Sequence, residues 1–144
     1  MGNDGTEMQD SGRKPEFIML VDDEIDNLRV VEKILKVNGF NVHAFDNPLT
    51  ALEHISIEDC IQCSILISAI KMEKMTGFEL VRHLTKLRPR FRFILMAGFK
   101  ITREEFVRVF PSIEIFDILT KPVSPSELIQ KVDSCFRSRI ANSH

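Results

Sequence analysis

The first fifteen residues of the 144-residue chain are polar and show no hydrophobic period, and a regular pattern begins at Phe17. From there, short runs of consecutive apolar residues alternate with stretches in which apolar residues recur every three or four positions. Unbroken runs are typical of strands buried on both faces, and the longer spacing is typical of amphipathic helices. The runs predict five strands, at residues 17–21, 42–45, 65–67, 91–96 and 113–119.

The segments between these runs predict five helices, and residues that favour helix ends mark their limits. Asn38-Gly39 is a typical C-terminal stop, and Ser124-Pro125-Ser126-Glu127 is a capping box with proline in the first turn. Pro89 and Pro111 end two further helical patterns. Helices are expected from Pro48 to Ile55 and from Pro125 onward, and the apolar stripes of the other three begin at Ile25, Phe78 and Phe106.

Strands and helices that alternate along a chain with short loops require right-handed crossovers and a parallel sheet covered on both faces. The predicted fold is therefore α/β: a doubly wound (βα)5 single domain with a five-stranded parallel sheet, as in flavodoxin. We expect the domain to span residues 16–138, with a flexible N-terminal tail at 1–15 and a C-terminal tail at 139–144. Function in such sheets lies at the carboxyl ends of the strands.

Composition narrows the possible partners. The 19 basic and 21 acidic side chains give a net charge of −2, which argues against a nucleic-acid or anionic membrane surface. No apolar run approaches the roughly 18 residues that a membrane span needs, and the N-terminal segment lacks a secretory pattern. With an odd number of cysteines, three, we expect a cytoplasmic protein without a disulfide framework.

Cys60 and Cys63 form a C-x-x-C motif. Such a motif is a redox pair or half of a zinc site, and the zinc site needs two further ligands. No second C-x-x-C and no H-x3-H accompanies it in the sequence. We therefore favour two reduced thiols near the start of a strand.

Charged residues follow the first and last predicted strands. The acidic residues Asp22, Asp23 and Glu24 directly follow the first strand. Adjacent carboxylates of this kind suit Mg²⁺. Alternatively, they cap the next helix, because acids favour the positive end of the helix dipole. Lys121 ends the last strand, before Pro122. A lone lysine at a strand end is usually solvated, but an ammonium beside the acids is an arrangement for holding a phosphoryl group.

Four blocks resemble, in order and spacing, the receiver domain of two-component response regulators over residues 16 to about 138. The blocks are Val21–Glu24, Ile65–Leu80, Ile94–Phe99 and Leu119–Pro122. The resemblance implies a receiver fold that accepts a phosphoryl group from a sensor histidine kinase or phosphotransfer protein, on an aspartate at the end of the third strand. It also implies signalling to an output protein rather than an enzyme.

The resemblance assigns roles to several residues of this chain. Asp22 and Asp23 match the acids that hold Mg²⁺, and the backbone carbonyl of Lys71 matches a further metal ligand. Lys121 matches the lysine that contacts the phosphoryl oxygens.

Three positions depart from the family pattern. The acceptor position, eight residues before Gly77, is Ala69, which carries no oxygen. The Ser/Thr position on the fourth strand is Ala97. The switch aromatic is replaced by Ile118, with Phe116 two residues earlier on the same face of the expected strand.

These departures predict a phosphorylation-deficient receiver with weak or absent Mg²⁺ binding, in which Lys121 turns toward Asp22 or Asp23. Ser68 is not expected to replace the acceptor, because its side chain points to the opposite face of the strand from Ala69. Two explanations of the alanine stay open. The chain is either a natural pseudo-receiver or a variant in which an aspartate at 69 was changed to block phosphorylation.

Because only residues 137–144 follow the last apolar helical stripe, we expect a stand-alone receiver that acts through protein–protein contacts. Phe106, Phe110 and Phe116 either belong to that contact surface or fill the core. A second hypothesis is a haloacid-dehalogenase-like phosphatase with Asp22 as nucleophile, although the Asp-x-Asp-x-Thr motif is absent. A third is a structural adaptor whose acids only cap a helix.

Overall fold

Five parallel strands form one sheet in the order β2-β1-β3-β4-β5. The computed structural model describes residues 16–58 and 63–142. The strands are β1 (Phe17–Val21), β2 (Asn41–Phe45), β3 (Cys63–Ala69), β4 (Arg92–Ala97) and β5 (Asp117–Thr120). The expected N-terminal tail at 1–15 and Cys60 lie outside the described residues.

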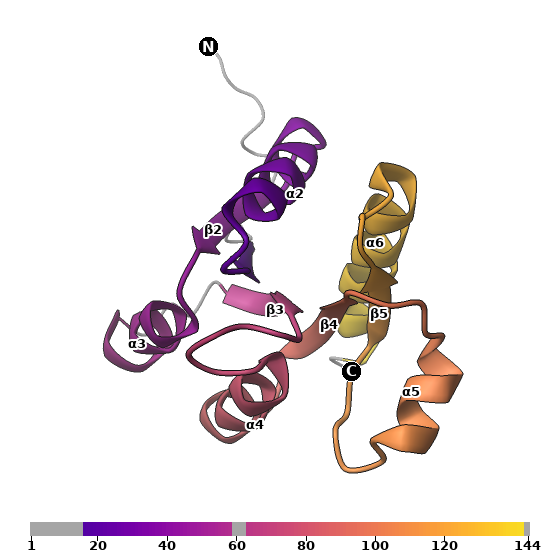
Figure 1. The fold of residues 1–144 in the computed structure, drawn as a ribbon. Coiled ribbons are helices and arrows are strands. Elements are labelled where there is room, and N and C mark those ends of the chain that lie inside the picture. The colour runs from indigo at the N-terminus through magenta and orange to yellow at the C-terminus, as the bar shows by residue number, and fades with distance from the viewer. Residues whose placement is uncertain (1–15, 59–62, 143–144) are drawn as a thin grey trace.

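Helices cover both faces of the sheet (Figure 1). They are α2 (Ile25–Val37), α3 (Pro48–Glu58), α4 (Gly77–Leu87), α5 (Arg103–Val109) and α6 (Pro125–Asn142). Helices α2 and α6 lie on one face, and α3, α4 and α5 lie on the other. This arrangement confirms the predicted α/β fold. Helix α6 runs to Asn142, so residues 139–142, which were expected in a C-terminal tail, are helical.

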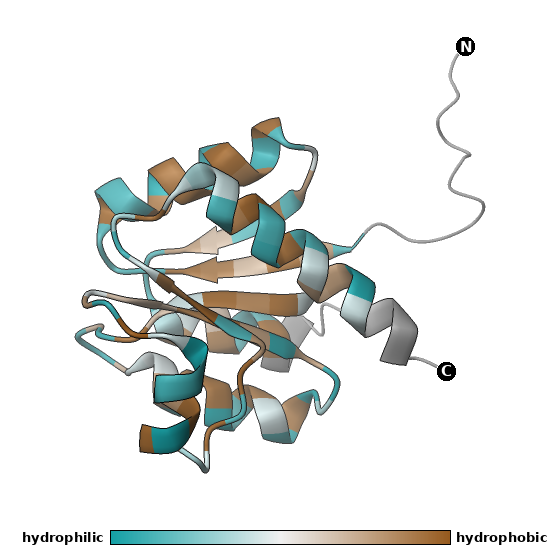
Figure 2. Ribbon diagram, turned by 90° about the vertical axis from the view of Figure 1, so that its right-hand side faces the viewer, coloured by the Kyte–Doolittle hydropathy of each residue, from teal (hydrophilic) through white to brown (hydrophobic). Residues whose placement is uncertain are grey.

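The core lies along the three central strands, which are apolar on both faces (Figure 2). Every residue from Ile18 to Val21 is fully buried, as are the corresponding central residues of β3 and β4. Burial on both sides is the reason why these strands read as unbroken apolar runs in the sequence. No helix in the described part of the chain is long and apolar enough to cross a bilayer.

Local signals explain where the helices begin and end. Gly39 has φ of 93°, a left-handed conformation that glycine adopts without strain, so the expected stop after α2 is confirmed. Helices α4 and α5 each begin at a reciprocal capping box, formed by Thr76 with Glu79 and by Thr102 with Glu105. Neither capping box was among the predicted helix signals.

The N-terminus of α6 forms half of the expected capping box. The backbone N–H of Glu127 donates to Ser124 Oγ at 3.4 Å, whereas the Glu127 carboxylate pairs with Lys131 at 3.1 Å. Lys131 Nζ also donates to the carbonyl of Ile118 at 2.6 Å. The lysine thereby fastens α6 to β5.

The predicted start of the fifth strand is wrong, because β5 begins at Asp117 rather than at Ile113. Ile113 and Ile115 are buried, but they lie in the connection between α5 and β5. A buried connection and a short strand together produced one apolar run. Phe116, just outside β5, donates its N–H to the carbonyl of Phe93 at 2.7 Å.

Phe106 belongs to the core, which supports the second of the two expected roles for the phenylalanines. Its side chain is 1% exposed, and its ring centroid lies 5.1 Å from that of Phe110 and 5.9 Å from that of Phe78. Phe110 and Phe116 are half-buried against the same core.

Candidate functional site

Strand register brings the expected site residues to one edge of the sheet. Asp22 directly follows β1, whose Val21 pairs with Ser68, so Asp22 lies level with Ala69 on the neighbouring strand. Ala97 ends β4, and its carbonyl accepts a 2.8 Å hydrogen bond from the backbone N–H of Lys121. The carboxyl ends of four strands thus meet here, as expected for a parallel sheet.

Asp22 is fully buried at this edge, and both of its carboxylate oxygens are engaged. Oδ1 accepts from the backbone N–H of Glu24 at 2.9 Å. Oδ2 accepts from Asn27 Nδ2 at 2.7 Å and lies 3.0 Å from Lys121 Nζ. A carboxylate with 0% exposure needs such donors and a counter-charge, because water cannot solvate it.

Lys121 turns toward Asp22, which confirms the expectation for its side chain, and it also reaches Glu24. Its Nζ lies 2.5 Å from Glu24 Oε1. Burial acts to lower the pKa of Lys121, but the hydrogen bonds to Glu24 and Asp22 outweigh that effect and raise the pKa above its usual value. The same hydrogen bond and the charge of Lys121 lower the pKa of Glu24, whose side chain is 65% exposed.

Asp23 points to a different part of the site. Its Oδ2 accepts a 2.9 Å hydrogen bond from the backbone N–H of Glu73, in the loop between β3 and α4 that also contains Lys71. Glu24, the N-cap residue of α2, makes no side-chain capping hydrogen bond. The Glu24 side chain therefore does not cap α2, although Asp22 accepts the backbone N–H of this N-cap residue.

The loop between β3 and α4 closes tightly against the end of β3. The backbone N–H of Gly77 donates to the carbonyl of Ile70 at 2.8 Å. A Cβ at Gly77 would overlap the carbonyl oxygen of Ala69, so only glycine fits this approach. The close approach of this carbonyl therefore explains why glycine stands at this position of the family motif.

The two positions that the sequence resemblance matches to the acceptor and the hydroxyl carry only methyl groups. Ala69 is 1% exposed at the end of β3, and Ala97 is fully buried at the end of β4. The hydroxyl of the neighbouring Ser68 is buried and donates to the Ala69 carbonyl at 2.8 Å. These positions supply no side-chain oxygen to the edge.

The two residues considered for the switch position lie in β5 and just before it. Ile118 is buried in β5, and its backbone carbonyl accepts from Lys131. Phe116 precedes the strand, and its carbonyl accepts a 2.8 Å hydrogen bond from Arg103 Nε at the start of α5.

Two side chains at the site were missed in the sequence. Glu24 was seen only as a third acid, although it is a partner of Lys121. Asn27 donates to Asp22 from the first turn of α2, and its Nδ2 also lies 3.8 Å from Met96 Sδ. Its place five residues after Asp22 was the signal, since the first turn of a helix that follows a strand faces that strand's end.

A family model for the response regulator receiver domain matches residues 18–133, and the chain belongs to this family. Receiver domains are generally signalling domains of two-component phosphorelays rather than enzymes, and they generally bind Mg²⁺ at their acidic site.

Individual relatives give the same result. The chain is 34% identical over 82 residues to the response regulator receiver protein CpdR of Brucella abortus, covering 57% of this chain and 66% of that protein. It is 33% identical over 116 residues to the sensor kinase CckA of the same organism, covering 80% of this chain but only 12% of the kinase. A CheY-like receiver structure from Methanospirillum hungatei is 25% identical, with a TM-score of 0.77 over 90% of this chain and 99% of that one.

The residues at this edge fit Mg²⁺ poorly. The Asp22 carboxylate is already paired with the Lys121 ammonium and accepts two hydrogen bonds. The Asp23 carboxylate accepts a hydrogen bond from the Glu73 amide. Ala69 adds no carboxylate. A metal ion would have to displace the ammonium and compete with these hydrogen bonds for the remaining oxygens.

Proposed function

We propose that this receiver domain signals through protein–protein contacts without forming an aspartyl phosphate. The observation that carries the proposal is the buried methyl group of Ala69 at the acceptor position. Covalent phosphoryl transfer requires a nucleophilic oxygen, and a methyl group neither attacks phosphorus nor ligates a metal.

The surroundings of Ala69 support the same conclusion. Lys121 matches the family's phosphoryl-binding lysine, and its ammonium group forms ion pairs with Asp22 and Glu24. Ala97 has no hydroxyl with which to bind a phosphate. Two side-chain oxygens of the phosphorylation chemistry are thus missing and its lysine is paired with other carboxylates, so Mg²⁺ binding is expected to be weak or absent.

The expected partners are a sensor histidine kinase or phosphotransfer protein and an output protein. One relative, CckA, is itself a sensor kinase, which favours a partner of this class. The natural pseudo-receiver and the variant of a phosphorylatable protein both remain consistent with this proposal, because they differ only in what residue 69 is in the parent gene. The cytoplasmic location stays a prediction.

The phosphatase alternative receives no support from the geometry. Its nucleophile would be Asp22, but this carboxylate is fully buried and hydrogen-bonded to Asn27 and Lys121. Incubation with p-nitrophenyl phosphate tests it directly. Turnover that disappears in Asp22→Asn would establish the enzyme and overturn the receiver proposal.

Phosphoryl acceptance itself is tested by intact-mass measurement after incubation with acetyl phosphate and Mg²⁺. We expect no added phosphoryl group on the unaltered chain. Ala69→Asp restores an acceptor, whereas Ala69→Asn is its matched control, with similar shape and no nucleophile. Phosphorylation of the unaltered chain that persists in Ser68→Ala would place an acceptor elsewhere and contradict the proposal.

A further inference from the structure

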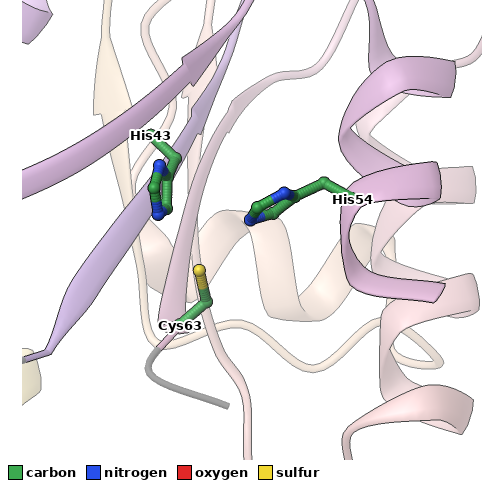
Figure 3. A group of neighbouring side chains, drawn as sticks. All are labelled: His43, His54 and Cys63. Carbon is green, nitrogen blue, oxygen red and sulfur yellow. The ribbon is translucent and has the colours of Figure 1, made fainter. Parts of the chain in front are cut away.

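Three residues that commonly bind transition metals meet on the face of the sheet covered by α3. His43 comes from the middle of β2, His54 from α3 and Cys63 from the start of β3 (Figure 3). Their candidate ligand atoms, the imidazole nitrogens and the thiol sulfur, all lie within 4.8 Å of one another. The group is distinct from the acidic edge, since Cys63 and Ala69 lie six positions apart at opposite ends of β3, a separation of about 20 Å.

An irregularity in the sheet brings the thiol into this group. Phe17 pairs with Cys63 and Ile18 pairs with Ile65, so the pairing of β1 with β3 skips Ser64. Regular alternation along β3 would place Cys63 on the same face as Ile65. A bulge re-aims a side chain, and here it places Cys63 on the face of Phe17 and His43.

Aromatic rings hold the two imidazoles in place. The ring of Phe17 stacks on His43 with centroids 4.3 Å apart and an angle of 11° between the planes. The ring of Phe45 packs against His54 at 5.4 Å, and the two imidazoles lie 4.9 Å apart. Nε2 of His54 and the whole of Cys63, which is 4% exposed, are shielded from bulk water.

The chemistry of this donor set narrows the kind of ion to a transition metal. Two imidazole nitrogens and one thiolate suit Zn²⁺ or copper, whereas Mg²⁺ and Ca²⁺ prefer carboxylates and carbonyls, and the tests below use Zn²⁺. In a tetrahedral zinc site, bond lengths of about 2.0–2.3 Å place the ligand atoms roughly 3.3–3.6 Å apart. The largest separation of 4.8 Å between ligand atoms here exceeds that value by about 1.5 Å at most, a difference that side-chain rotation can cover.

We propose that His43, His54 and Cys63 form a zinc site with three protein ligands and a fourth position open to water or another ligand. Deprotonation of the Cys63 thiol accompanies binding, and the proton passes to solvent. The ion ties α3 to β2 and β3. Because the unfolded chain does not assemble these ligands, bound Zn²⁺ stabilises the folded state.

Zinc binding is measured by competition with a chromophoric chelator, together with thermal unfolding in Zn²⁺ or in excess chelator. We expect one ion per chain and a rise in Tm of about 9 °C at a hundredfold excess over Kd. His54→Ala and Cys63→Ser should each weaken binding at least about tenfold. His83→Ala, an exposed histidine on α4, and Cys135→Ser, a buried cysteine on α6, are matched controls that should bind normally.

Cobalt substitution tests the ligand set directly. A sulfur-to-Co²⁺ charge-transfer band should appear with the unaltered chain, persist in Cys60→Ser and disappear in Cys63→Ser. Near-ultraviolet circular dichroism in chelator confirms that each variant is folded, and His54→Gln serves if the alanine variant is not. The assignment would be overturned by any of three results: no stoichiometric Zn²⁺ binding, an unchanged Zn²⁺ affinity in Cys63→Ser, or a charge-transfer band that depends on Cys60 instead of Cys63.

Discussion

The buried ion pair between Lys121 and Asp22 should stabilise the domain far more than the exposed pair between Lys121 and Glu24. Lys121→Met keeps the aliphatic stem and removes the charge. It leaves a fully buried carboxylate whose remaining donors, the Glu24 amide and the Asn27 side chain, are both neutral. Removing one partner of a buried pair typically costs 3–5 kcal/mol, and because two donors remain we expect about 2–4 kcal/mol here.

Glu24→Gln is the matched control for this variant. It removes the other partner of the same ammonium, but the Glu24 side chain is 65% exposed and water can replace its contact. We therefore expect a loss below about 1 kcal/mol. Urea unfolding measures both values from the shift of the midpoint, provided that the denaturant slope is unchanged.

A third variant isolates the cause of the loss. In the Lys121→Met background, Asp22→Asn should recover part of the lost stability, because a neutral amide needs no counter-charge. Equal losses in Lys121→Met and Glu24→Gln, or no recovery by Asp22→Asn, would refute the reasoning. Either result would mean that the buried carboxylate does not depend on the lysine.

Three further predictions concern sterics, pH and metal. Gly77→Ala should lower the free energy of unfolding in urea by about 2–3 kcal/mol, because the added Cβ meets the Ala69 carbonyl. Gly98→Ala has open space at its Cβ and should change stability by less than about 0.5 kcal/mol. Equal effects of the two substitutions would contradict this. Because the pKa of Glu24 is lowered, its stabilisation is complete above its unfolded pKa of about 4.3 and is lost as pH falls through the lower folded value. Glu24→Gln should flatten the stability curve below about pH 4.3, and an unchanged slope would count against the contact with Lys121. Titration with Mg²⁺ should raise Tm only slightly, and sub-millimolar binding would contradict the poor fit of the acidic edge.

Hydrophobic pattern was sufficient to predict the order of strands and helices, but not every boundary. The central strands are buried on both faces, so their unbroken apolar runs had one simple interpretation. The error at β5 arose because Ile113 and Ile115 are buried without belonging to the strand. Apolarity reports burial rather than backbone conformation, and a buried connection next to a four-residue strand has the same pattern as one longer strand.

The acidic edge could be predicted in part. Asp22 and Lys121 were found because each directly follows a strand, and parallel strands bring such residues together. The partners Glu24 and Asn27 depend on how α2 leaves β1 and on the rotamer of one long lysine side chain. Sequence spacing does not encode either of these.

The candidate zinc site lay beyond any local motif. The C-x-x-C pattern drew attention to Cys63, but the second and third ligands come from β2 and α3, at positions 43 and 54. The cluster requires the order of three strands and a one-residue irregularity in the pairing between β1 and β3. Neither feature has a signature in the sequence.

The way in which the loop after β3 is anchored has one more consequence. Backbone contacts at Gly77 and the carboxylate of Asp23 hold it, and the side chain at position 69 takes no part in these contacts. The path of this loop is therefore set by its own backbone and by Asp23, so a change of residue 69 alone should leave the loop in place.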